Sequence, residues 1–198
     1  MKKLLISLCA VASLSACCSV KPDYVVRETM KGGEPDWVED VADAAKNKEE
    51  LKEFRFYKAE AESTKQRLCL KSAEARATQN IASEVAQEIF AKFQEKNESF
   101  DDAANSKMQD VLEQNIKTNL HGVQLAGTYW ERRAYLTEMG AAQNIEKFKC
   151  DAVVKIKVSA LEEALDAYKK RTLRQLKDKD VKKALQEAVD AYEDSLSD

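Results

Sequence analysis

Three stretches of the chain alternate apolar and polar residues with a period near two, which is typical of β-strands with one buried face. They run from Phe54 to Glu62, from Val123 to Trp130 with a possible extension to Leu136, and from Phe148 to Val158. We therefore predict an antiparallel sheet of about three strands, buried on one face and solvated on the other. The segment 24–26 could add a short extended piece at a sheet edge, and Gly127 could mark a bulge or a close approach.

Between the first two strands the apolar period changes to nearly four, which predicts helices. Ser63 or Thr64 can cap a helix that runs to about Glu95, and Ser99 or Asp101 can start a second one. Each helix would lay one apolar stripe on the sheet. The row of the first helix, spaced by four residues, is Cys69, Ala73, Ala77, Ile81, Val85 and Ile89.

The last part of the chain, from Ser159 to Ser195, reads as helical and highly charged, with a break near Asp178 or Asp180. It carries two short apolar seams, and the second is too short to predict a coiled coil. That seam either lies on its own domain or binds a partner or a second copy, and the pattern leaves both open. As the best candidate partner-binding surface it comprises Val181, Leu185, Ala188 and Tyr192.

Together these elements predict an α+β fold: a small antiparallel sheet with two helices packed on one face, plus a charged C-terminal helical extension. The predicted domain organisation has four parts. They are a signal peptide at 1–16, a lipidated N-terminus and tether at 17–33, an α+β domain at 34–158, and the helical extension at 159–198.

The N-terminal segment has the order of a secretory signal: two lysines, an apolar run from Leu4 to Leu14, and small residues before Cys17. The apolar run is shorter than a bilayer-spanning helix requires. Leu14-Ser15-Ala16-Cys17 has the form of a bacterial lipobox, which predicts cleavage before Cys17 and lipid attachment at its thiol. The simpler alternative is an ordinary signal peptide with Cys17 as a bystander.

Charge narrows the possible partners. Cleavage at Cys17 would remove two lysines and leave 30 basic against 35 acidic residues, a net charge of −5. An acidic chain is not typical of a nucleic-acid-binding protein, which carries a basic patch. The charges of both signs alternate closely, as on solvated helix faces.

Two cysteines are expected to meet. Cys69 lies on the inward row of the first helix and Cys150 on the inward face of the third strand, and disulfides persist in the oxidising compartment that a signal peptide implies. The alternative is two buried thiols that never meet. With His121 as the only histidine and no Cys-x-x-Cys, the chain lacks the usual ligands of a zinc site, and no cofactor is predicted.

Catalytic motifs are missing: there is no Gly-x-Ser-x-Gly, no phosphate-binding glycine loop and no His-Glu-x-x-His. We therefore expect a non-enzymatic protein. One hypothesis is a structural or assembly module that docks other envelope proteins. The other is a binding module for a small or peptidic ligand, which would use the solvated sheet face with Trp130 and Tyr135.

Several elements follow one another along the chain: the lipobox, Pro35–Val38, the strand from Phe54, Ala73–Ala77, Tyr129–Trp130 and Val153–Val158. With them, over residues 24–158, the chain resembles the LPP-type bacterial outer-membrane lipoproteins, named for a mass of twenty kilodaltons and related to flagellar outer-membrane lipoproteins. The resemblance implies an α+β domain without enzymatic activity, anchored through lipid on the periplasmic face of the outer membrane. Cys18, and not Asp, follows Cys17, which agrees with outer-membrane sorting.

Overall fold

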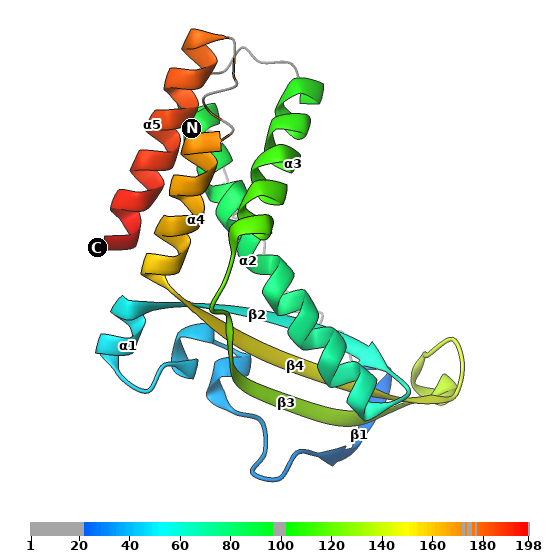
Figure 1. Ribbon diagram of the computed structural model, residues 1–198. Coiled ribbons are helices and arrows are strands. Elements are labelled where there is room, and N and C mark those ends of the chain that lie inside the picture. Colours follow the sequence, from blue (N-terminus) through cyan, green and yellow to red (C-terminus); the bar gives the residue numbers. More distant parts are fainter. Residues whose placement is uncertain (1–21, 97–101, 172, 174–175, 177, 198) are drawn as a thin grey trace, which may run out of the picture.

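A computed structural model describes residues 22–96, 102–171, 173, 176 and 178–197 (Figure 1). The described residues form an α+β body around one antiparallel sheet, which confirms the predicted fold class. The strands lie in the order β1-β3-β4-β2, so β1 and β2 form the two edges. Their bounds are β1 Tyr24–Thr29, β2 Phe54–Ser63, β3 Gln124–Tyr135 and β4 Ile145–Lys157.

The sheet has four strands and not about three, because β1 pairs with β3. Tyr24 lies opposite Tyr135, and the pairing continues to Thr29 with one register shift after Val26. The folded body therefore begins inside the segment that the sequence assigned to a tether at 17–33. The short extended piece expected at 24–26 is confirmed as part of this edge strand. Six residues are too few for a periodic signal, so the full length of β1 depends on backbone pairing with β3.

Helix α2 (Gln66–Lys96) organises the remaining helices. Its 31 residues extend over about 46 Å. Figure 1 shows its first half lying across the sheet and its second half projecting beyond it. There α2 contacts α3 (Asp102–Asn119) and α5 (Lys179–Ser197), and α4 (Val158–Arg171) contacts both α3 and α5. The projecting half is therefore one member of a four-helix bundle.

The main hydrophobic core is continuous from the sheet into this bundle. Fully buried side chains of α4 and α5, among them Leu161, Leu165 and Leu185, belong to the same cluster as Val154 of β4. Arg55 of β2 also donates a hydrogen bond of 2.7 Å to the carbonyl of Leu196. The C-terminal region is thus part of the body, and the prediction that 159–198 forms an extension was wrong.

The sheet face opposite α2, called the outer face below, is only partly solvated. Two 3₁₀ turns, η1 (Asp36–Val38) and η2 (Val41–Ala44), and helix α1 (Lys48–Glu53) precede β2 and lie on that side. A Cβ at Gly127 would lie 3.2 Å from the Trp37 ring and from Val153 Cγ1, so the ring packs directly on the glycine. The β3–β4 register also shifts beside Gly127, which confirms both the bulge and the close approach.

Candidate functional site

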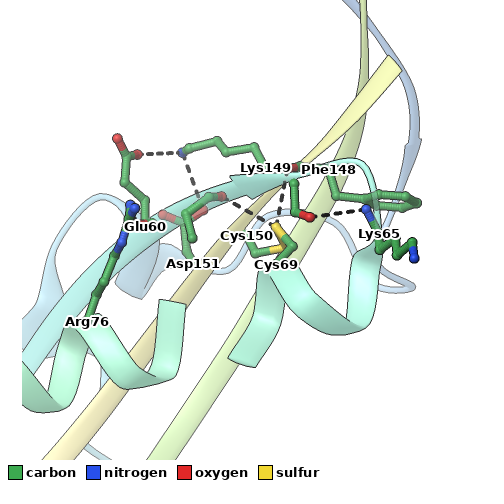
Figure 2. The surroundings of a disulfide bond; sticks show 10 residues. Glu60, Lys65, Cys69, Arg76, Phe148, Lys149, Cys150 and Asp151 are labelled. Atoms are coloured by element: carbon green, nitrogen blue, oxygen red, sulfur yellow. Dashed lines mark hydrogen bonds and ion pairs between the residues drawn. A yellow bond between two sulfur atoms is a disulfide. The ribbon is translucent and has the colours of Figure 1, made fainter. Parts of the chain in front are cut away.

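The predicted cysteine pair is a disulfide bond. Cys69 on α2 and Cys150 on β4 are bonded, with their Cα atoms 5.7 Å apart and a sequence separation of 81 (Figure 2). Neither residue is exposed to solvent. The expectation that they meet is confirmed, whereas the predicted lipid-attachment residue, Cys17, lies outside the described residues.

Small residues explain how the helix comes close enough for this bond. Ala73 on α2 and Ala61 and Ala152 on the neighbouring strands are buried around the disulfide and form a second, smaller core cluster with it. An alanine side chain lets a helix backbone approach a sheet closely, as the row Cys69, Ala73, Ala77 indicated. Trp130 and Phe148 close this cluster with an edge-to-face contact, their ring centroids 5.7 Å apart.

The C-terminal seam does not form an exposed binding surface. Leu185 and Ala188 are fully buried, Tyr192 is 3% exposed, and Val181 packs against the same core. Burial raises the pKa of Tyr192, and its hydroxyl is hydrogen-bonded to that of Tyr57. The prediction of a partner-binding site at these residues was wrong, because α5 lies on α2 of its own chain.

Trp130 and Tyr135 cannot act together as a single binding surface. Successive residues of a strand point to opposite faces, and these two are separated by an odd number of positions. Trp130 lies opposite Cys150 in the register, on the helix-covered face, whereas Tyr135 pairs with Tyr24 on the outer face. The expected combination of Trp130 with Tyr135 is therefore wrong.

The outer face carries a network of paired charges from three strands. Figure 2 shows the part of it around Lys149. Lys149 bridges Glu60 at 3.4 Å and Asp151 at 3.3 Å, and Lys147 bridges Glu62 at 3.2 Å. We call this set, together with its aromatic neighbours, the charged face: Tyr24, Glu60, Glu62, Glu131, Arg133, Tyr135, Lys147, Lys149 and Asp151.

Two tyrosines hold the charges of this face in place. The guanidinium of Arg133 lies 4.0 Å from the centre of the Tyr24 ring, a cation–π contact. The hydroxyl of Tyr135 donates a hydrogen bond of 2.7 Å to Glu62. Burial alone would raise the pKa of Glu62, but the hydrogen bonds from Tyr135 and Lys147 outweigh it and hold that pKa below its ordinary value. The face is thus ordered by its own contacts.

Two carboxylates of the charged face are buried, which the sequence pattern did not predict. Asp151 is 2% exposed, although it lies on the polar side of the alternation in β4 and was expected to be solvated, and Glu131 is 7% exposed. Glu131 pairs with Arg133. Burial raises the pKa of Asp151, and the nearby charge of Lys149 opposes that rise. Period two identifies the face of a residue, but it does not say whether another segment covers that face.

A hollow of about 390 Å³ adjoins Asp151 at the β2 edge. Asp151 Oδ2 contacts Lys149 as an ion pair but has no hydrogen-bond partner in the structure. Lys58, Arg76 and Asn80 also line the hollow, so it presents both charge signs. This arrangement suits a ligand that carries both an ammonium and a carboxylate group, and it contains no nucleophile beside a base.

Other positions in the described part of the chain offer little sign of a metal site or a further functional site. No group of three or more His, Cys, Asp or Glu side chains able to hold a metal ion occurs there. His121 forms an exposed contact of 3.1 Å with Glu163 and joins no larger site. Among the described helices, none is both long enough and apolar enough to span a membrane.

Comparison with known proteins adds no identification: no protein-family model matches this chain, and no curated protein is significantly similar to it. The resemblance to LPP-type lipoproteins therefore remains a prediction from the sequence.

Proposed function

We propose that the protein is a lipid-anchored lipoprotein of the outer membrane that acts as a non-catalytic docking module for other proteins of the cell envelope. The membrane contact is the lipid on Cys17, on the periplasmic face, and no nucleic acid is bound. The charged face of the sheet offers the docking surface, because its polar and aromatic groups are ordered before a partner arrives.

The observation that carries this proposal is the buried Cys69–Cys150 disulfide. Structural disulfides are rare in the cytosol and common in exported proteins. The bond therefore agrees with export of the protein, which the N-terminal signal and lipobox predict. Because the charged side chains of this sheet face are already paired with one another, they support a protein-binding role rather than a catalytic one. Asp151 has a raised pKa and adjoins a hollow, but its neighbour Lys149 is already paired with it, whereas catalysis usually needs such a group beside a free partner for the reaction.

We expect the Cys17→Ala variant to accumulate as an uncleaved precursor that incorporates no labelled palmitate. The substitution removes the thiol that carries the diacylglyceryl group. Metabolic labelling and mass measurement of the N-terminus would show this, with Cys18→Ala as the matched control that should label and mature normally. Normal processing and labelling of Cys17→Ala would contradict the lipid anchor.

The docking role predicts that crosslinking in intact envelopes captures a specific partner through the charged face. We expect Lys147→Glu combined with Tyr135→Ala to reduce the captured complex severalfold, because both residues lie on that face. Lys170→Glu makes the same charge change on the exposed side of α4 and should have no effect. Equal capture by both variants would contradict docking through this face.

A second candidate function rests on the hollow beside Asp151: a binding module for a small zwitterionic or peptidic ligand. The buried carboxylate oxygen without a hydrogen bond is the specific observation in its favour. The crosslinking experiment separates the two functions. Co-purification of a small ligand, sensitive to Asp151→Asn and without any partner protein, would favour the second.

A further inference from the structure

The chain enters its folded body at one end of the sheet. The carbonyl of Asp23 accepts a hydrogen bond of 3.1 Å from the N–H of Leu136, so the first described residues lie against the turn between β3 and β4, residues 136–144. Figure 1 shows this turn at the end of the sheet that lies away from α3, α4 and α5. The predicted anchor and the four-helix bundle therefore belong to opposite ends of the molecule.

Helix α2 begins at the same end of the sheet as this turn. The last residue of β2, Ser63, lies opposite Phe148, near the start of β4. The helix starts shortly after Ser63 and, in Figure 1, lies beside the turn. We call residues 65–71 together with residues 136–144 the entry end.

The start of α2 places unpaired cations and an exposed leucine at the entry end. Lys65, Arg67 and Lys71 are exposed, and none of them forms an ion pair with another described residue. Leu68, which lies between them, is 56% exposed, the highest value among the large apolar residues of the described chain. Cations near the start of a helix oppose its dipole, so the stability of α2 does not account for them.

The turn adds a surface that is nearly free of charge. Residues 136–144 contain one charged side chain, Glu138, although charged residues make up 34% of the chain. Met139 is 39% exposed. Beside the turn, the ring centres of Tyr24 and Tyr135 lie 5.5 Å apart, and tyrosine is enriched where proteins meet the headgroup layer of a membrane. The entry end thus combines cations, exposed apolar side chains and tyrosines.

We propose that the entry end is a contact surface for the phospholipids of the leaflet that holds the anchor. The cations at the start of α2 lie on headgroup phosphates, and Leu68 and Met139 reach the apolar boundary below them. Basic side chains are attracted to an anionic membrane surface, and exposed apolar side chains add to such a contact.

The length of the chain before the body selects this end as the one that meets the bilayer. The inference rests on the proposed lipid anchor at Cys17. The stretch from Cys17 to Asp23 can reach at most about 22 Å, so an anchored chain keeps the entry end beside the membrane and directs the bundle away from it. In this orientation the charged face is roughly perpendicular to the membrane and stays accessible to a protein partner.

Quenching of a tryptophan reporter by brominated phospholipid tests this contact. The purified full chain is reconstituted into phosphatidylglycerol vesicles whose lipid carries bromine near the headgroup end of its acyl chains. After subtraction of the wild-type signal, we expect Met139→Trp to be quenched roughly twofold or more strongly than Val111→Trp, because tryptophan at the interface lies close to the bromines. Val111, on α3 in the bundle, is the matched control, with an exposure of 40%.

Reversing two cations tests their part in the contact. Arg67→Glu combined with Lys71→Glu should reduce the quenching of the Met139→Trp reporter roughly twofold or more, because each change removes attraction to the anionic surface. Lys170→Glu combined with Lys183→Glu makes the same charge change at exposed positions of the bundle and should have no effect. The melting temperature of the first double variant should stay the same or rise, because acidic residues near a helix start favour its dipole.

Quenching of Met139→Trp no stronger than that of Val111→Trp would overturn the proposal, and so would a fall in melting temperature with unchanged quenching on reversal of the two cations. If the chain incorporates palmitate but the reporter is not quenched, the contact is rejected and the anchor stands. If the chain incorporates no palmitate and the reporter is still quenched, only the anchor is rejected.

Discussion

Replacing both Cys69 and Cys150 with alanine should lower the free energy of unfolding by about 3–5 kcal/mol. The bond closes a loop of 81 residues, so its loss returns much conformational freedom to the unfolded chain. Total stabilities are of the order of 5–15 kcal/mol. The melting temperature should therefore fall by roughly 10 °C or more.

Guanidinium unfolding of the two proteins measures this difference. Cys18→Ser is the matched control, since it removes a thiol without breaking the bond and should leave the unfolding midpoint unchanged. Because neither Cys69 nor Cys150 is exposed, a mild reductant should cleave the bond in the unfolded protein and spare it in the folded one. Equal stability of the double variant and the wild type would show that the bond contributes little.

The Leu185→Ala variant should lose about 2–5 kcal/mol of stability, with no change in oligomeric state. Leu185 is fully buried in the core that joins α5 to α2. Removing its side chain leaves a cavity that a close-packed bundle cannot fill by relaxing. Chemical denaturation gives the energy, and sedimentation gives the oligomeric state.

Lys183→Ala serves as the control on the same helix, because that lysine side chain is 79% exposed and pairs only loosely, at 4.0 Å, with Glu187. It should change stability by less than about 0.5 kcal/mol. If Leu185→Ala kept the wild-type stability but abolished a complex, the seam would serve a partner after all, and the buried position of α5 would be contradicted.

Periodicity in the sequence located most elements of the fold. The predicted strand from Phe54 is β2, the predicted helix ending near Glu95 is α2, and the break near Asp178 separates α4 from α5. There the Asp178 carboxylate accepts hydrogen bonds from the backbone N–H groups of Asp180 and Val181. These features are local, because the spacing of apolar residues and the capping side chains act within a few residues.

The pairing of the two cysteines could also be predicted from the sequence. Cys69 and Cys150 lie on the apolar faces of a helix and a strand that had to pack together, and the two face assignments follow from period four and period two. The bond then needed only the correct longitudinal position of the helix on the sheet, which the small residues beside Cys69 favour.

What covers each face was decided only by the tertiary structure. The seam of α5 was recognised as apolar, but an apolar seam looks the same whether α2 of the same chain or a partner covers it. Asp151 follows the polar side of the period-two pattern of β4, yet it is buried among residues far away in sequence, on β2 and α2. An edge piece was expected only at 24–26, and pairing with β3 extends this strand to Thr29. The spacing of apolar residues shows which face of a helix or strand is buried. Which other element covers that face depends on how the whole chain packs, and a local pattern does not contain this information.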